Sequence, residues 1–203
     1  MNVTIIGAGN MGRGIGHRIV AGAHSITIVD RDPEEAKQLA EELRSAAEGG
    51  ATVEADGPGT EPRGEVVVLA VYYPGDLEIV RDLGDRLVGK VVVDISNPLN
   101  QTFDGLATEP GTSAAEEVAE AAPAGTRVVK AFNTTFSGTL VEGQVAGQPL
   151  DVFIAGDDEE AKETVAQLVR DGACGPSTSA RWSVRDSWRA SGCSGSRCSS
   201  RWG

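Results

Sequence analysis

The distribution of hydrophobic residues along the chain predicts an alternation of short strands and amphipathic helices. Short, continuously apolar runs are typical of the inner strands of a parallel sheet, because helices cover both faces of such a sheet. We expect strands at residues 3–6, 25–29, 51–53, 65–71, 90–95, 127–131 and 151–155. Apolar residues with helical spacing predict helices after the first strand and at residues 33–47, 76–87, 112–122 and 158–170.

This order of elements favours the α/β class. Strands that alternate with helices build a parallel sheet with right-handed crossover connections. We therefore expect a Rossmann-type, doubly wound and mainly parallel sheet in one domain, residues 1–172. In such sheets, ligands bind beyond the carboxyl ends of the strands.

A glycine-rich turn lies between the first strand and the first helix. Gly7, Gly9 and Gly12 form the G-x-G-x-x-G pattern of dinucleotide-binding turns. The first glycine permits the tight turn, the second lets the backbone approach a pyrophosphate, and the third lets the helix lie close to the strand. The free N–H groups of the helix then face the phosphates. We expect the whole turn to contact the cofactor: Gly7, Ala8, Gly9, Asn10, Met11 and Gly12.

Asp30 and Arg31, which follow the second strand, are candidates for binding the adenosine ribose. Asp32 is a good N-cap for the following helix, with Pro33 in the first turn and Glu35 completing a capping box. That assignment leaves Asp30 free to accept hydrogen bonds from the ribose. An acid at this position favours NAD, whereas the neighbouring Arg31 can pair with the 2′-phosphate of NADP. These two residues leave the choice between NAD and NADP open.

The ends of three further strands are expected to converge where a nicotinamide would lie. The polar groups there are Tyr72, Asn97 and Asn133, and Ala70 and Val71 precede the tyrosine. Turn chemistry is an equally good explanation of Asn97, which precedes a proline. The sequence offers no catalytic side chain.

Composition and charge exclude several kinds of partner. The chain has 203 residues, 40% of them hydrophobic, and a net charge of −12, which argues against nucleic acid and anionic membranes as partners. Met1 leads almost directly into the first strand, and no apolar run approaches the roughly 20 residues that span a bilayer. We expect a cytoplasmic protein. The histidines and cysteines lack the spacing of a metal site.

The composition changes abruptly after residue 172. Residues 174–203 hold nine serines, five arginines, and all three cysteines and all three tryptophans of the chain. If a GC-rich gene is read one base earlier, Cys174 to Ser179 can become Leu-Arg-Pro-Ile-Asp-Val, followed by a turn and an amphipathic helix. We interpret residues 173–203 as an aberrant tail produced by a frameshift. A disordered Ser/Arg tail is the alternative.

Four segments together resemble a known family. They are Gly-Ala-Gly-Asn-Met-Gly at residues 7–12, Val-Asp-Arg-Asp-Pro at 29–33, Asp-Ile-Ser-Asn-Pro-Leu at 94–99 and Val-Lys-Ala-Phe-Asn-Thr at 129–134. Over residues 1–172 the chain resembles the coenzyme F420-dependent NADP oxidoreductases, in a bacterial branch. The resemblance implies direct hydride transfer between NADP(H) and the deazaflavin coenzyme F420, a co-substrate, with Asp30 and Arg31 at the ribose. Asp30 departs from archaeal members, which have neutral or basic residues there. The family continues into C-terminal helices that help to form the deazaflavin site and a homodimer.

Two other functions remain open. The glycine turn also resembles that of pyrroline-5-carboxylate reductase, which suggests a reductase of a small imine or keto substrate. That family needs a helical dimer domain for which this chain has no room. The second alternative is a dinucleotide-binding protein without catalysis, either a redox sensor or a remnant disabled by its tail.

Overall fold

The computed structural model describes residues 1–47, 49–100 and 102–179. Eight strands form one sheet in the order β10-β9-β6-β5-β4-β1-β2-β3. The strands are β1 (Asn2–Ile6), β2 (Ser25–Val29), β3 (Val53–Asp56), β4 (Val66–Leu69), β5 (Val91–Asp94), β6 (Arg127–Ala131), β9 (Asp151–Ala155) and β10 (Gly175–Ser179). The six strands from β6 to β3 in this order are parallel, so the predicted doubly wound, mainly parallel sheet is confirmed.

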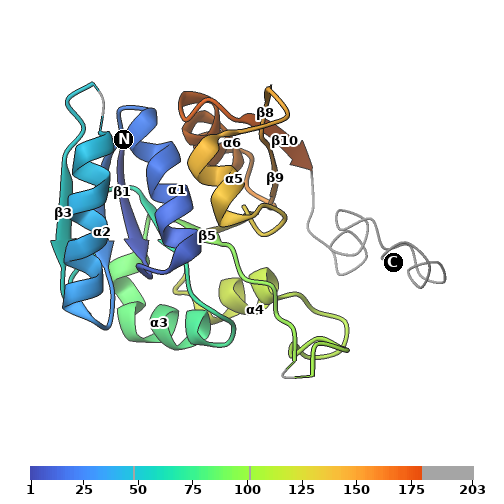
Figure 1. Cartoon of the computed structure of the whole chain (residues 1–203). Helices are drawn as coiled ribbons and strands as arrows, with labels where there is room; N and C mark the ends of the chain where they lie inside the picture. Colours follow the sequence, from blue (N-terminus) through green and yellow to red (C-terminus); the bar gives the residue numbers. More distant parts are fainter. Residues whose placement is uncertain (48, 101, 180–203) are drawn as a thin grey trace.

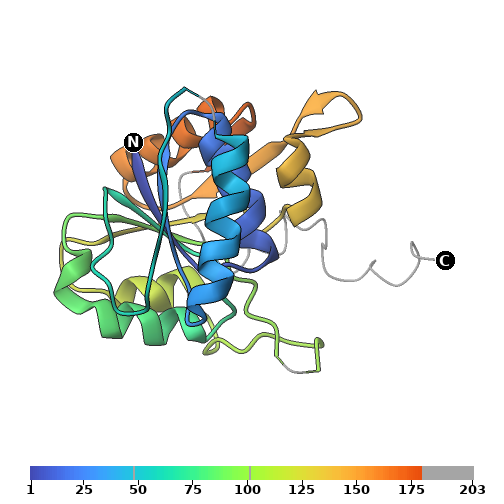
Figure 2. The same cartoon turned by 60° about the vertical axis from the view of Figure 1, so that its left-hand side comes forward.

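Helices cover both faces of the sheet (Figure 1). They are α1 (Asn10–Ala21), α2 (Pro33–Ala46), α3 (Gly75–Leu83), α4 (Ala114–Ala121), α5 (Ser137–Glu142) and α6 (Glu159–Asp171), with a 3₁₀ turn η1 (Gly84–Leu87). Helices α1, α2, α5 and α6 bury side chains in one hydrophobic cluster, and α3 and α4 bury theirs in a second. Figure 2, turned by 60°, shows α3 and α4 together on the face away from α1 and α2.

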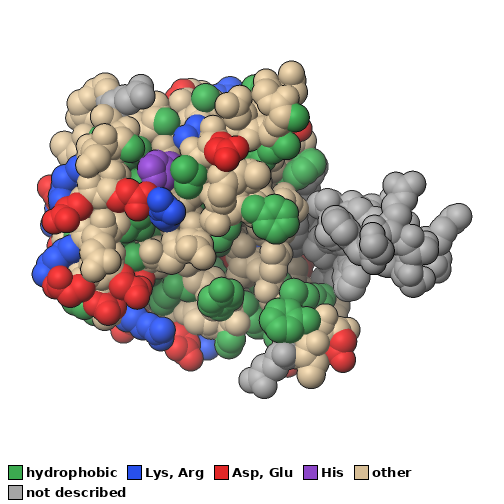
Figure 3. Space-filling view, in the orientation of Figure 1, with side chains coloured by type: hydrophobic (Ala, Val, Ile, Leu, Met, Phe, Trp, Pro, Cys, Tyr) green, Lys and Arg blue, Asp and Glu red, His purple; other side chains and the backbone are tan. Residues whose placement is uncertain are grey.

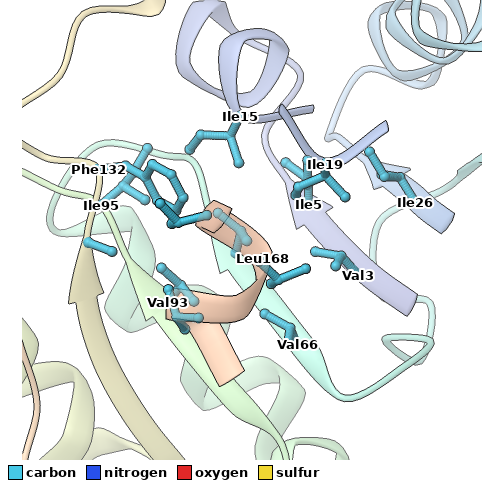
Figure 4. Packing of buried hydrophobic residues seen from close by; sticks show 14 of the residues in the cluster. Val3, Ile5, Ile15, Ile19, Ile26, Val66, Val93, Ile95, Phe132 and Leu168 are labelled. Carbon is cyan, nitrogen blue, oxygen red and sulfur yellow. The ribbon is translucent and has the colours of Figure 1, made fainter. Parts of the chain in front are cut away.

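The larger cluster fixes α1 on the sheet (Figure 4). Ile15 and Ile19 of α1 lie over Val3 and Ile5 of β1, and all four side chains are at most 3% exposed. Burial of each such side chain contributes about 1.5–3 kcal/mol relative to leaving it in water. The start of α1 is therefore held rigidly above the end of β1.

The structure departs from the predicted elements in three places. The third strand is Val53–Asp56 rather than residues 51–53, because Gly49 and Gly50 adopt positive φ angles and form a turn before it. Helix α5 and the short hairpin β7 (Gln144–Val145) and β8 (Gln148–Pro149) were not expected. Strand β9 has its predicted bounds but pairs antiparallel with β6, since this connection contains no full crossover helix.

Capping of α2 also differs from the prediction. Asp32 is the N-cap and Pro33 lies in the first turn, as expected. The Asp32 carboxylate, however, accepts the N–H of Glu34 at 2.9 Å, and Glu35 completes no capping box. A capping box is found instead at α4, between Ser113 and Glu116.

The described chain extends beyond residue 172, where we expected the domain to end. Cys174 is buried, and Gly175–Ser179 forms β10, which pairs in parallel with β9. Residues 173–179 therefore pack on the domain. The predicted origin of the tail in a frameshift stays a prediction, and most of that tail, residues 180–203, lies outside the described residues. Among the described helices, none has the length and apolar composition required to cross a membrane.

Candidate nucleotide-binding site

The carboxyl ends of β1, β2, β4, β5 and β6 lie along one edge of the sheet, because these strands are parallel neighbours. Every residue that the sequence nominated follows one of these strands. The structure thus brings the candidates to a common edge, while their individual contacts with a cofactor stay predictions.

The glycine turn is closed by contacts that exclude side chains. Gly7 has φ +114°, and a Cβ atom there would lie 2.3 Å from the carbonyl oxygen of Ala70. A Cβ atom on Gly12 would lie 2.0 Å from the carbonyl oxygen of Gly7. Ala70, a candidate that directly follows β4, therefore forms one wall of the turn. A Cβ atom on Gly9 would meet nothing within 4 Å, so this glycine faces open space.

The N-terminus of α1 fits a pyrophosphate. Gly9 is the N-cap, no side chain caps the helix, and its first turn carries no acidic residue. The first N–H groups of a helix lack intrahelical partners, and together with the helix dipole they favour anions. Asn10 is exposed at this end, whereas Met11 packs against the larger hydrophobic cluster. The open position beside Gly9 gives phosphate oxygens access to the backbone.

Asp30 also has a structural role that the sequence did not predict. Its Oδ2 atom accepts the N–H of Ala8 at 2.7 Å, and its Oδ1 atom accepts the N–H of Asp32 at 2.9 Å. The carboxylate thereby ties the glycine turn to the turn before α2. Each carboxylate oxygen keeps a lone pair that can accept a ribose hydroxyl. The neighbouring Arg31 is exposed.

The ends of β5 and β6 are linked by two asparagines. Asn97 Nδ2 donates to the carbonyl oxygen of Asn133 at 2.9 Å, and Asn133 Nδ2 donates to Asn97 Oδ1 at 3.2 Å. Asn133 Oδ1 is buried and accepts no hydrogen bond, so one acceptor remains available in this pair. Beyond β4, Val71 is half-buried and the side chain of Tyr72 is 93% exposed. These groups suit a ligand with an amide and a flat ring.

A buried charge cluster, formed by Asp76, Asp94, Ser96 and Lys130, lies beneath these loops. Lys130 Nζ donates to Asp94 Oδ2 at 2.7 Å and also to the carbonyl oxygen of Ser96. The N–H of Ser96 donates to Asp94 Oδ1 at 2.7 Å. Asp76, Asp94 and Lys130 are each at most 2% exposed.

Sequence reasoning missed this cluster, although a signal existed. Asp94 ends the apolar strand β5, and Lys130 lies between apolar residues in β6, whose other charged residue, Arg127, stands at its start. Side chains in strands covered on both faces are buried, and a buried charge requires a partner. Their pairing could therefore have been inferred from the predicted sheet.

Surface hollows elsewhere do not compete with this site. One hollow lies beside α6, between Met1 and the acidic residues Glu159, Glu160 and Glu163. It is on the side of the sheet where β1 begins, and its carboxylates disfavour a dinucleotide. Figure 3 shows charged side chains gathered over α2 and hydrophobic ones exposed on the opposite side. Exposed aromatic side chains follow β4, β5 and β6, namely Tyr72, Phe103 and Phe136.

The glycine turn and the first five parallel strands match a family model. Residues 2–98 match the model described as NADP oxidoreductase, coenzyme F420-dependent. Over these residues, just under half of its length, the chain is similar to that family. It is a family of NADP-dependent oxidoreductases, and its model spans the glycine turn, Asp30 and Asn97.

Individual relatives and solved structures show the same similarity. The F420-dependent NADP reductase of Methanothermobacter thermautotrophicus is 28% identical over 178 residues, which cover 83% of this chain and 75% of that protein. The metalloreductase STEAP3 of Rattus norvegicus is 32% identical over 168 residues, but the chain spans only 31% of its length. A crystal structure of a candidate F420-dependent NADP reductase from Arthrobacter sp. FB24 superposes with a TM-score of 0.71 at 26% identity. The superposition covers 88% of this chain and 84% of the other.

More distant neighbours share the fold alone. An imine reductase from Bacillus cereus superposes with a TM-score of 0.60 at 18% identity, covering 88% of this chain and 54% of that protein. The predicted resemblance to the F420-dependent family is confirmed, whereas the bacterial branch stays a prediction.

Proposed function

We propose that this protein transfers a hydride between NADP(H) and a deazaflavin of the coenzyme F420 type. The observation that carries the proposal is the uncapped N-terminus of α1 beside the open position at Gly9, within the segment that matches the family. The bound coenzyme would supply the hydride. The contribution of the chain is to hold two flat rings in contact, and this requires no acid–base side chain.

The residues at the strand ends support a site in which the protein positions the rings and the coenzyme supplies the hydride. The N–H groups of α1 would bind the pyrophosphate, and Asp30 and Arg31 would contact the adenosine ribose. The paired amides of Asn97 and Asn133 would orient the carboxamide of the nicotinamide. The exposed ring of Tyr72 would pack against a flat ligand. A homodimer and a cytoplasmic location, expected from the sequence, are part of this proposal.

An absorbance assay tests the function. The full chain is mixed with NADPH or NADH and a deazaflavin, and the loss of deazaflavin colour is followed. We expect turnover with the deazaflavin and none with a small cyclic imine. Turnover of the imine alone would replace the proposal by the imine reductase alternative. Binding of the nucleotides without any turnover would favour a sensor or a remnant.

A further inference from the structure

The charge cluster holds two carboxylates and one ammonium group. Asp94 and Lys130 form a direct ion pair at 2.7 Å, and Asp76 adds a second carboxylate. Asp76 Oδ1 accepts the N–H of Leu77 at 2.8 Å, but its Oδ2 atom is buried without a hydrogen-bond partner. When Asp76 is ionised, the cluster therefore carries one net negative charge that is shielded from water.

Asp76 titrates close to neutrality. Desolvation, followed by the negative charge of Asp94, raises the pKa of Asp76 from its ordinary value of 3.8 to about 6. The N–H of Leu77, the Ser96 hydroxyl and Lys130 oppose this shift without cancelling it. A buried, incompletely paired carboxylate is costly for folding, and such groups are common at functional sites.

The ionisable groups close to Asp76 lie in hydrogen-bonded pairs. The Tyr73 hydroxyl, just before α3, donates a hydrogen bond to Glu117 of α4. Burial, together with Glu117, raises the pKa of Tyr73, so the phenol stays neutral. Asp94 and Lys130 carry opposite formal charges and form an ion pair. The net charge of the cluster thus follows the protonation of Asp76.

The cluster is connected to the nicotinamide end of the candidate site through one residue. Asp94 and Lys130 hold the N–H and the carbonyl oxygen of Ser96. The next residue, Asn97, pairs with Asn133 at the edge of the sheet. A nicotinamide at that pair, as the proposed function requires, would lie beside a residue that directly follows Ser96, which the cluster holds. The oxidised ring is a cation and the reduced ring is neutral, so the charge acts on them differently.

We propose that ionised Asp76 tunes the site electrostatically in favour of oxidised over reduced nicotinamide, and that its protonation removes this preference. Asp76 acts across the Ser96–Asn97 turn and does not touch the coenzyme. The inference rests on the proposed function only in placing the nicotinamide at the ends of β5 and β6. The protein would accordingly favour the oxidised coenzyme more strongly above neutrality than in weak acid.

Paired binding measurements on the full chain test this inference. The dissociation constant of NADPH is measured by its fluorescence, and that of NADP⁺ by competition, from about pH 5 to about pH 8. The 2′-phosphate also titrates in this range, but it is common to both forms and cancels in their ratio. We expect the affinity for NADP⁺ relative to NADPH to rise roughly three- to tenfold with pH, as expected for one charge acting across several ångströms of protein.

Two variants on the same helix separate this role from a structural one. In Asp76→Asn the ratio should be independent of pH, because the amide has nearly the same shape but cannot ionise. In Asp82→Asn, whose side chain is 72% exposed, the ratio should follow the wild-type profile. If the affinity for NADP⁺ relative to NADPH does not change with pH in the wild-type protein, the inference is overturned and the proposed function is left intact. This measurement needs no variant. An unchanged slope in a folded Asp76→Asn protein also overturns it. Failure to bind either coenzyme overturns both the inference and the proposed function.

Discussion

Individual glycines of the turn have separable roles. Gly12 is required by packing, since a Cβ atom there would overlap the carbonyl oxygen of Gly7 at 2.0 Å. Gly9 has open space beside it and is required only if a ligand approaches. The same substitution at the two positions therefore tests the fold and the site independently.

We expect Gly9→Ala to leave the free energy of unfolding nearly unchanged and to weaken NADPH binding by about tenfold or more, because the methyl group would occupy the proposed phosphate position. Gly12→Ala should destabilise the protein by about 2 kcal/mol or more. Urea denaturation and fluorescence titration measure the two effects. Wild-type affinity in a folded Gly9→Ala protein would contradict the assigned pyrophosphate site.

We expect Asp30 and Arg31 to act in opposite directions on the choice of coenzyme. Arg31→Ala should weaken NADPH binding several-fold and leave NADH binding nearly unchanged, because an exposed guanidinium contributes up to about 1 kcal/mol to a phosphate pair. Asp30→Ser should favour NADPH relative to NADH, since it removes a negative charge near the 2′-phosphate. Dissociation constants of both coenzymes give the ratio. Equal effects of Arg31→Ala on both coenzymes would exclude a contact with the 2′-phosphate.

Asp76 makes stability depend on pH. Its pKa of about 6 in the folded protein exceeds its ordinary value of 3.8, so its contribution to stability is present at low pH and lost as pH rises through 6. Asp76→Asn should therefore raise the free energy of unfolding at about pH 8, by on the order of 2 kcal/mol relative to its effect near pH 4. Thermal unfolding of this variant and of Asp82→Asn at both pH values measures the difference. Equal effects of Asp76→Asn at the two pH values would show that the folded-state pKa is not raised.

At the scale of elements, capping residues stand at the starts of α2 and α6, although the capping box expected at α2 is absent. Asp158 was expected at the start of the last predicted helix, and its Oδ1 atom accepts the N–H of Ala161 at 2.7 Å. The antiparallel strand β9, by contrast, has no local signal, because its sequence resembles that of a parallel strand. Its direction depends on the short connection through α5.

Asp158→Ala should destabilise the protein by about 1 kcal/mol through loss of the N-cap. Asp157→Ala, at the adjacent exposed position, serves as the control and should change stability by less than about 0.5 kcal/mol. Chemical denaturation of both variants makes the comparison. Equal losses would mean that Asp158 contributes only its charge.

At the scale of the whole molecule, the C-terminal segment carries the remaining prediction. The frameshift interpretation predicts that the codons for Cys174 to Ser179, read one base earlier, encode Leu-Arg-Pro-Ile-Asp-Val. Sequencing the gene over this segment is the measurement, and codons incompatible with that reading would exclude it. A protein with the restored frame should unfold at a higher temperature, because an amphipathic helix would bury additional apolar surface.

The sequence by itself determined the class of fold, the order of the main elements and the edge of the sheet where the candidate site lies. These follow from hydrophobic period, glycine positions and capping residues, which are local properties. Only the tertiary structure decided that Asp30 is bound to Ala8, that Asp94 pairs with Lys130, and that Asp76 adds an unbalanced charge beside them. These contacts join residues 18 to 54 positions apart in the sequence, and no periodic pattern encodes such distances. The glycine turn could therefore be identified from the sequence, whereas the buried charge cluster near the ends of β5 and β6 required the folded chain.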